Sequence, residues 1–232
     1  MKNTTGYCFE KRISNSSTPI LTDLKKEDRL KTIIVNDSVI APSKIVCCGR
    51  NYVEHIEELQ SEFPEEPVFF MKPNSAISEQ LQSFHQEPLH YEGELCFLFE
   101  EGRFSAVGFG LDITKRTLQN KLKSKGLPWE RSKAFDGSAV FSKFTRIDRV
   151  SQNLGLELSI NGQIVQSGNI GLMLYKPHDI LLQIQSFISL NNGDIVMTGT
   201  PKGVGQINSG DLFCGNVTDN SSLITSGEWV AG

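Results

Sequence analysis

Two glutamates separated by a single residue stand out in the stretch YEGELCFL, residues 91–98. Side chains of a strand alternate between its two faces, so Glu92 and Glu94 would share one face, about 6–7 Å apart along the backbone. Cys96 and Leu98 continue that face, where the carboxylates would repel each other and burial would raise their pKa. A divalent cation would remove both costs, and oxygen ligands favour Mg²⁺, Mn²⁺ or Ca²⁺ over Zn²⁺. A solvated strand end, or pairing with Lys or Arg of a neighbouring strand, is the alternative.

Asp112 offers a third carboxylate. It ends an apolar strand expected over residues 107–113, just before a helix expected from about 115 to 124 with Thr114 as its cap. Binding groups often gather where such segments meet loops. Three carboxylates would suit a Mg²⁺ that keeps coordination positions open for substrate and water. His90 would lie on the face of the two glutamates, either as a ligand or as a neighbour of the ligands.

The elements that must position these residues are mostly strands. Apolar runs bounded by Gly, Pro and Asn predict strands at 45–48, 68–71, 91–99, 195–198 and 211–217, and a hairpin at 156–167 around Asn161-Gly162. Helices are expected at 52–60, with Asn51 as N-cap and Glu54 completing a capping box, and at 177–190. Strands outnumber helices without regular βα alternation, so the predicted class is mostly β with a few helices (α+β), not a doubly wound sheet.

Composition narrows the functional classes. The 232 residues, 38% of them hydrophobic, predict one core domain at 41–232 with an N-terminal appendage at 1–40 that carries a strand or two. A net charge of −4 and a pI near 5.6 disfavour nucleic-acid binding. No apolar run approaches the roughly 18 residues of a membrane span. Five cysteines without CxxC spacing indicate reduced thiols and a cytoplasmic protein, with Cys47 and Cys48 as buried strand residues.

Seven stretches, in the same order along the chain, resemble the fumarylacetoacetate hydrolase family, specifically its small single-domain members. Together they cover roughly residues 44–217. They are Gly49-Arg50-Asn51-Tyr52 through His55 to Glu58, PVFFMKP (67–73), YEGEL (91–95), Leu111-Asp112-Ile113-Thr114 through Gln119, GLPW (126–129), KAFD (133–136) and TGTPKGVG (198–205).

The resemblance implies a mixed β-sandwich roll, usually a homodimer, that holds Mg²⁺ or Mn²⁺ on Glu92, Glu94 and Asp112. Residues 41–232 would be its catalytic domain. The resemblance further implies that Lys133 lies near the metal, and that a catalytic dyad sits on a mobile lid and activates water in hydrolytic members. The implied dyad is His55 and Glu58, and the implied substrate-facing residues are Arg50, Gln119 and Thr200.

This chain departs from the family pattern in two places. The segment between Glu94 and Asp112 is shorter than in relatives, so a helix that usually lies there must be trimmed or absent. Arg116-Thr117 also stands where the family usually has Arg-Asp, which leaves the substrate open. Arg50 and Arg116 could each bind a carboxylate in bidentate fashion or form surface ion pairs.

The resulting hypothesis is a metal-dependent enzyme for small 2-oxo acids such as oxaloacetate or acylpyruvates. The metal would stabilise the enolate that forms when a proton, CO₂ or an acyl group leaves C3. His55 and Glu58 would share a helix face, so that Glu58 orients His55 as a general base. Water activation favours acylpyruvate hydrolysis or oxaloacetate decarboxylation. An oxaloacetate tautomerase or 5-carboxymethyl-2-hydroxymuconate-type isomerase, and a catalytically idle metal-binding protein, are the alternatives. Residues 198–205 lack the GxxxxGK[ST] order of a nucleotide-binding loop.

Overall fold

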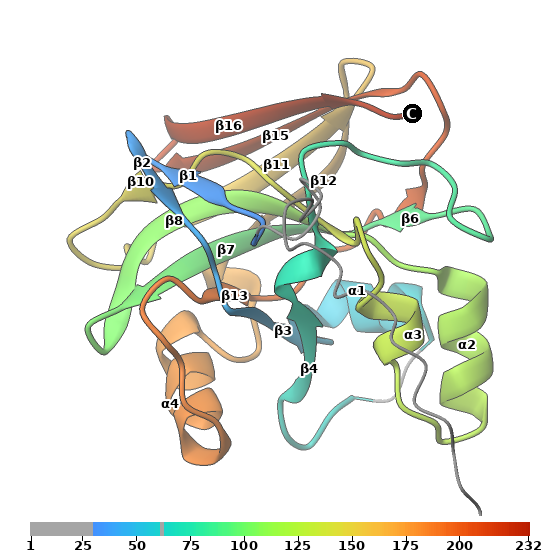
Figure 1. Ribbon diagram of the computed structural model, residues 1–232, viewed down its shortest axis with the longest axis horizontal. Helices are drawn as coiled ribbons and strands as arrows, with labels where there is room; N and C mark the ends of the chain where they lie inside the picture. The colour runs from blue at the N-terminus through green and yellow to red at the C-terminus, as the bar shows by residue number, and fades with distance from the viewer. Residues whose placement is uncertain (1–29, 61–62) are drawn as a thin grey trace, which may run out of the picture.

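The computed structural model describes residues 30–60 and 63–232 (Figure 1). Strands dominate it and form two large sheets that pack on each other, which confirms the predicted mostly β class. Most of the predicted appendage, residues 1–29, lies outside the described residues. Its remaining part forms a hairpin of β1 (Ile33–Val35) and β2 (Ser38–Ile40), whose buried Ile33 and Val35 pack into the same core cluster as Ile45 and Phe144.

The larger sheet has the strand order β4-β3-β13-β7-β8-β9-β5, with β10 paired to β8. The pairs β13/β3 and β5/β9 are parallel and the others are antiparallel, so the sheet is mixed. Its strands are β3 (Lys44–Gly49), β4 (Val68–Pro73), β5 (Ile77–Ser78), β7 (Gly93–Glu100), β8 (Arg103–Asp112), β9 (Ala139–Phe141), β10 (Thr145–Arg146) and β13 (Ile195–Met197).

The smaller sheet is antiparallel, with the order β12-β11-β15-β16. Its strands are β11 (Leu154–Ile160), β12 (Gln163–Asn169), β15 (Leu212–Asp219) and β16 (Ser222–Val230). The predicted hairpin is confirmed: Asn161 and Gly162 join β11 to β12 with φ of 52° and 80°, the left-handed pair that a type I′ turn requires. β16 was not predicted. A short ladder of β6 (His90–Tyr91) and β14 (Gly205–Gln206) stands beside the sheets.

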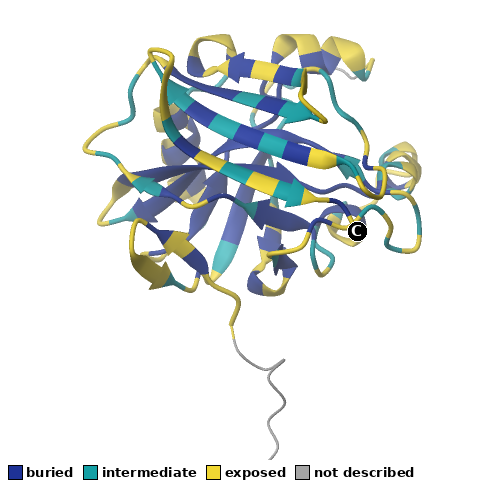
Figure 2. Ribbon diagram, turned by 90° about the horizontal axis from the view of Figure 1, so that it is seen from above, coloured by how far each residue is buried: buried dark blue, intermediate teal, exposed yellow. Residues whose placement is uncertain are grey.

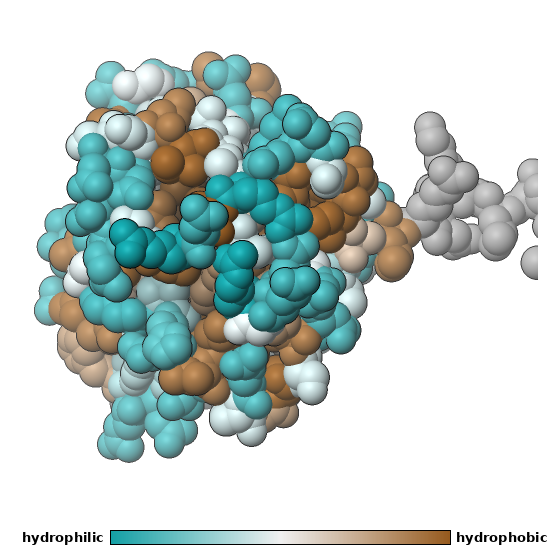
Figure 3. Space-filling model, turned by 90° about the vertical axis from the view of Figure 1, so that its left-hand side faces the viewer, coloured by the Kyte–Doolittle hydropathy of each residue, from teal (hydrophilic) through white to brown (hydrophobic). Residues whose placement is uncertain are grey.

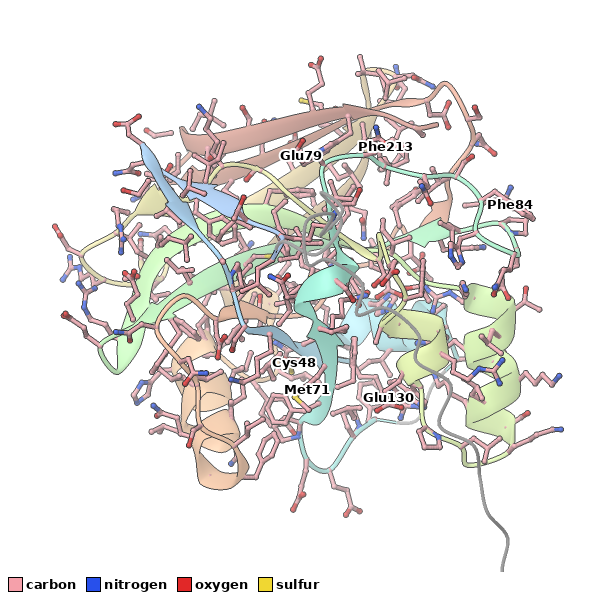
Figure 4. All side chains as sticks on the ribbon, in the orientation of Figure 1. Cys48, Met71, Glu79, Phe84, Glu130 and Phe213 are labelled. Atoms are coloured by element: carbon pink, nitrogen blue, oxygen red, sulfur yellow. The ribbon has the colours of Figure 1, made fainter. Side chains whose placement is uncertain are left out.

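The core between the two sheets fixes which face each β7 side chain takes. Leu95, Phe97 and Phe99 belong to the buried cluster shared with the smaller sheet, whereas Cys96 and Leu98 belong to the cluster on the opposite face. Figure 2 shows buried and exposed residues alternating along the smaller sheet, and Figure 4 shows Phe213 on its β15. Burying one such aromatic or aliphatic side chain contributes roughly 1.5–3 kcal/mol. A slip by one residue would exchange the larger side chains of the inter-sheet cluster with Cys96 and Leu98 on the other face, so packing on both faces also fixes the face of the glutamates.

Within residues 30–60 and 63–232 the structure has four helices: α1 (Val53–Glu58), α2 (Arg116–Ser124), α3 (Glu130–Lys133) and α4 (Pro177–Phe187). Short 3-10 turns lie at Asn74–Ala76 and Ile170–Leu172. Figure 1 shows α1, α2 and α3 grouped at the lower right, with α4 at the lower left and β4 between them. In the part of the chain that the structure describes, every helix is too short and too polar to cross a membrane.

Both predicted helix caps are wrong. The residue before α1 is Tyr52, without a side-chain cap, because the Asn51 amide instead bonds the backbone of Tyr175 and Thr198. The residue before α2 is Lys115, and the Thr114 hydroxyl donates to Asp112 O. The same Thr114 hydroxyl accepts a hydrogen bond from Lys133 Nζ over 2.6 Å. In each case a partner distant in sequence takes the side chain that local spacing had assigned to the helix.

The short segment between Glu94 and Asp112 is a plain hairpin. β7 and β8 are joined by Glu101 and Gly102, with φ of 48° and 80°, so no helix intervenes. This agrees with the trimming predicted from the sequence. Figure 3 views the side of the molecule that holds the turn, where polar side chains surround separate apolar patches.

Candidate active site

The structure brings together the three carboxylates proposed from the sequence. One carboxylate oxygen from each of Glu92, Glu94 and Asp112 lies within 4.8 Å of the others, and all three residues are buried. Strand pairing explains the meeting: β7 and β8 run antiparallel, and the Asp112 backbone N–H donates to Glu92 O over 2.8 Å. Period-two alternation then places Glu94 beside them.

Three cationic side chains surround these carboxylates. Lys133 Nζ lies 2.8 Å from Glu92 Oε2 and 2.7 Å from Asp112 Oδ2. Lys72 Nζ lies 2.8 Å from Asp112 Oδ1, and Arg116 Nη2 lies 2.5 Å from Glu92 Oε1. We call these six residues the inner cluster; their ionised charges would cancel. Lys72 lies in the stretch PVFFMKP but was not predicted as a site residue.

The electrostatics of the inner cluster suit a divalent cation. Burial, and then the neighbouring Asp112 and Glu92, raise the pKa of Glu94 well above its ordinary value. Burial also raises the pKa of Glu92, but Lys133 and Arg116 outweigh it and hold that pKa below its ordinary range. The approach of Lys72 to Asp112 Oδ1 lacks hydrogen-bond geometry, and this buried oxygen accepts no hydrogen bond from residues 30–60 or 63–232. The three residues offer only oxygen ligands, and Asp112 Oδ1 has a lone pair that accepts no hydrogen bond. A bound cation would also favour the ionised form of Glu94, so the group fits Mg²⁺ or Mn²⁺.

The turn at 198–205 forms hydrogen bonds with Glu94 and with the backbone of Gly93. Gly199 donates its N–H to Glu94 Oε2 over 2.7 Å and has φ of +97°. A Cβ on Gly199 would come within 2.8 Å of the Asn51 Cβ, so a side chain does not fit there. The Thr200 hydroxyl donates to Gly93 O over 2.9 Å and accepts from Gln166 Nε2 over 2.8 Å. Thr200 thus fixes the backbone between the two glutamates, and it does not line the pocket described below.

The predicted dyad is present on α1. His55 is buried, and its Nδ1 lies 3.2 Å from Glu58 Oε2. Glu58 Oε1 in turn accepts the Gly203 N–H over 2.9 Å, which joins α1 to the 198–205 turn. Burial lowers the pKa of His55, while Glu92 and the hydrogen bond to Glu58 partly oppose that shift. The neutral ring is therefore favoured, and pairing of Nδ1–H with Glu58 leaves Nε2 as the basic nitrogen.

A small pocket is lined by both His55 and Glu92. It encloses about 30 Å³, room for about one water, and is also lined by Ile56 of α1 and by Leu59, which follows α1. Its lining also includes the following residues: Gly49, Arg50, His55, Phe70, Glu92, Arg116, Gln119, Lys123, Trp129 and Lys133. The predicted residues Arg50 and Gln119 are thus brought to the site, whereas His90 is absent from the carboxylate group. A larger hollow of about 490 Å³ on the smaller sheet is lined by uncharged polar residues, Leu156 and Glu157, so it lacks comparable chemistry.

The change from Arg-Asp to Arg116-Thr117 does not remove the carboxylate from the start of α2. Glu87 Oε1 accepts the backbone N–H groups of Thr117 and Leu118, over 2.9 and 3.3 Å. An acidic group there complements the helix dipole. Arg116 donates to Gln119 Oε1 over 2.7 Å as well as to Glu92, so this end of α2 is tied to the inner cluster.

Comparisons with known proteins agree with this architecture. The model of the fumarylacetoacetate (FAA) hydrolase C-terminal family matches residues 44–230. The chain is 40% identical over 202 residues to the oxaloacetate tautomerase YcgM of Escherichia coli K12, covering 79% of this chain and 91% of that protein. It is 37% identical over 191 residues to a mitochondrial oxaloacetate decarboxylase of Dictyostelium discoideum, covering 74% and 88%.

The crystal structure of fumarylpyruvate hydrolase from Pseudomonas aeruginosa, in complex with Mn²⁺ and pyruvate, superposes with a TM-score of 0.79 at 26% identity. That match covers 90% of this chain and 100% of the other. The family model spans most of the chain, and the strands that carry the three carboxylates lie within it. This chain belongs to the fumarylacetoacetate hydrolase family.

Proposed function

We propose that this protein is a divalent-cation-dependent enzyme for small 2-oxo acids, and that its main reaction is keto–enol tautomerisation of an oxaloacetate-type substrate. The observation that carries the proposal is one pocket lined by a buried, carboxylate-paired imidazole, His55, together with Glu92 and Lys133. A base and a cluster suited to stabilise negative charge are the two parts that proton transfer next to a carbonyl needs. The oxaloacetate tautomerase among the relatives supports this choice.

Glu92, Glu94 and Asp112 would hold Mg²⁺ or Mn²⁺. Such an ion, when bound, supplies Lewis-acid stabilisation of charge on the carboxylate and 2-oxo oxygens of the substrate. The Mn²⁺ of the Pseudomonas aeruginosa fumarylpyruvate hydrolase supports the choice of a divalent cation. The unused lone pair of Asp112 Oδ1 supports its position in this chain.

In the proposed reaction, His55 moves the proton. Its Nε2 takes a proton from C3 of the keto form, and that proton is returned to the 2-oxo oxygen to give the enol. Glu58 holds Nδ1–H and so keeps the basic nitrogen directed at the substrate. Burial lowers the pKa of Lys133, but Asp112 and Glu92 outweigh it, so the pKa lies above its ordinary value. The charged Lys133 would then stabilise negative charge developing on the 2-oxo oxygen, while Arg50 and Gln119 orient the substrate.

Cleavage at C3 is the second candidate, either acylpyruvate hydrolysis or oxaloacetate decarboxylation. The pocket of about 30 Å³ next to His55 would take one water, which the same imidazole could deprotonate for hydrolysis. The decarboxylase and the fumarylpyruvate hydrolase among the comparisons support this branch. A third hypothesis, a catalytically idle metal-binding protein, would leave the pairing of the buried His55 with Glu58 without a use.

An assay panel separates these reactions. The protein with Mg²⁺ is given oxaloacetate and acylpyruvates, and enol absorbance, CO₂ and carboxylic acid release are followed separately. We expect the change in enol absorbance to exceed the other two rates above the metal-only background. Faster CO₂ or acid release would move the assignment to the cleavage branch, and no rate above background would favour the idle metal-binding protein.

We also propose that residues 41–232 form the catalytic domain with 1–40 as its appendage, and that two copies assemble as a homodimer. β4 and the outer strands β12 and β16 are sheet edges where strands of another copy or side-chain contacts could meet. Light scattering of the purified full chain tests the dimer. The cytoplasmic location stays a prediction.

A further inference from the structure

A groove lies apart from the candidate active site, beside α4. It encloses about 430 Å³ and is lined by α4, the turn from β7 to β8, the segment 148–152 and Ile170. Figure 1 shows α4 and this turn at the left of the molecule, and α2 and α3 at the right. Among the described residues, none lines both this groove and the pocket beside His55. The groove is therefore a separate cavity, in the size range of small-molecule sites.

Much of the lining of this groove is apolar. His178, Leu181, Leu182 and Gln185 stand at spacing i, i+3, i+4, i+7 on α4, so they share the helix face that borders the groove. At 1.5 Å per residue, this face extends along about 10 Å of the helix. Leu182 is 54% exposed, so an apolar ligand that covered it would remove apolar surface from water. The other apolar residues of the lining are Phe104, Val150, Ile170 and Pro177.

Cationic side chains line the same groove. Within residues 30–60 and 63–232, the lining holds Arg103, Arg149 and Lys176 against one carboxylate, Asp148, which leaves an excess of two positive charges. The whole chain carries a net charge of −4, so this excess is local. Charge of one sign in a cavity with apolar walls attracts a ligand of the opposite charge. The groove is therefore suited to an anion that also has apolar surface.

Arg149 is the cation whose donors are available to such an anion. Lys176 Nζ donates to three backbone carbonyls over 2.7–3.0 Å, and Arg103 Nη1 donates to three others over 3.2–3.4 Å. Glu100, the carboxylate near Arg103, forms its ion pair with Arg146. In the part of the chain that the structure describes, no hydrogen bond or ion pair involves the exposed Arg149 guanidinium. A guanidinium with free donors can pair with one carboxylate in bidentate fashion.

We propose that this groove is a binding site for an amphipathic carboxylate, a molecule with one anionic head and an apolar chain long enough to follow α4. Arg149 pairs with the head, while Arg103 and Lys176 add positive charge around it. The chain lies along Leu181 and Leu182. Charge and apolar surface are recognised together, so a ligand with only one of these parts binds weakly. The site needs no cation, because the carboxylates of the inner cluster do not line it.

Three matched ligands test the site without turnover. Octanoate has both parts, octanamide keeps the chain without the charge, and acetate keeps the charge without the chain. Calorimetric titration of the full chain should give a Kd about tenfold or more lower for octanoate than for either of the others. The Kd of octanoate should be the same with and without Mg²⁺. Equal Kd values for octanoate and octanamide, a requirement for Mg²⁺, or no octanoate binding at millimolar concentration would each overturn the proposal.

Two pairs of variants locate the bound ligand. Arg149→Gln should raise the Kd of octanoate about fivefold or more and leave that of octanamide unchanged. Arg131→Gln removes an exposed arginine outside the groove and should change neither Kd. Leu182→Asn should raise both Kd values about threefold or more. Leu172→Asn, at a residue that is also 54% exposed but outside the groove, should change neither.

Thermal unfolding without ligand checks that all four variants are folded. The substituted side chains are exposed, so we expect little change in stability. If a groove variant and its control weakened octanoate binding equally, octanoate would bind outside this groove, and the proposal would be overturned.

Discussion

The two halves of the candidate site are held in different ways. Glu94 stands on β7 and Asp112 on β8, and Glu92 lies directly before β7. The two strands pair with each other inside the larger sheet and are buried along nearly all of their length. His55 and Glu58 stand on α1, a helix of six residues without a side-chain cap. Helices this short have little stability of their own. The carboxylate half is thus held by the sheet, whereas the position of the His55 imidazole depends on contacts that α1 makes with its surroundings.

This difference suits a site that must admit its substrate. α1 covers a pocket of about 30 Å³, too small for a 2-oxo acid, so binding requires α1 or the side chains under it to move. Among the described residues, the polar side-chain contacts that α1 makes with the rest of the chain are the Glu58–Gly203 hydrogen bond and the exposed Glu54–Lys202 ion pair. Movement of α1 would admit the substrate while the sheet keeps Glu92, Glu94 and Asp112 in place. Four predictions test this contrast.

The largest effect is expected from Glu94→Gln, in the sheet half. The amide removes one charged ligand but can still accept the Gly199 N–H. We expect Mg²⁺ affinity to fall at least about 100-fold, since a ligand is lost, and turnover to fall with it. The pKa of Glu94 is raised in the folded chain, so the unfolded chain ionises this carboxyl more readily. The free energy of unfolding of the cation-free protein therefore decreases as pH rises above about 4.5. Cation-free Glu94→Gln should therefore be at least as stable as wild type at pH 7.

Calorimetry and thermal unfolding with and without Mg²⁺ measure this variant. Full retention of the cation would mean that the carboxylate cluster is not the metal site. A cation-free variant that unfolds far below wild type would mean that Glu94 serves the fold first.

His55→Asn is expected to affect turnover and spare the sheet half. Removing a general base typically costs roughly 10²–10⁴ in rate. Cation affinity should stay within about twofold of wild type, because no ligand stands on α1. Steady-state rates and a Mg²⁺ titration on the same preparation supply the comparison. A loss of Mg²⁺ affinity that parallels the loss of turnover would show that α1 and the carboxylates of the sheet do not act independently.

The pH dependence provides a smaller and more specific effect. Burial lowers the pKa of His55 below 6.5, so the neutral base persists at neutral pH and kcat/KM should decline only at lower pH. Glu58→Gln removes a contribution that raises this pKa, so the acid limb should shift to still lower pH while the maximal rate falls. The free energy of unfolding should also decrease below pH 6.5, because the unfolded chain binds a proton that the buried ring resists. An acid limb above pH 6.5 would contradict the assignment.

Lys202→Ala should have the smallest effect. The Glu54–Lys202 pair spans 3.1 Å, but both side chains are 62% exposed, and exposed pairs contribute within about 0.5 kcal/mol. We expect less than a twofold change in kcat/KM and no change in cation affinity. A larger change would mean that this surface contact, rather than the Glu58–Gly203 bond, positions α1.

The sequence by itself determined the cation half of the candidate site. Strand periodicity placed Glu92 and Glu94 on one face, because side chains two residues apart on a strand point to the same side. The hairpin at Asn161-Gly162 and the missing helix before Asp112 were also accessible, since both depend on local length and turn chemistry. The pairing of His55 with Glu58 followed from a spacing of three residues on a helix.

Only the tertiary structure decided what surrounds these groups. On β4, Met71 (Figure 4) is 44% exposed while Lys72 is fully buried, the reverse of what hydropathy predicts. Lys72 is stabilised there by Asp112 and by the carbonyl groups of Lys133 and Ser138, more than 30 residues away in sequence. Glu87 accepts the Thr117 N–H at the start of α2, and Asn51 accepts the Tyr175 N–H, so both also bind residues distant in sequence. A buried charge or amide is held by whichever distant segments the core brings to it, and such partners leave no periodic signal in the local sequence.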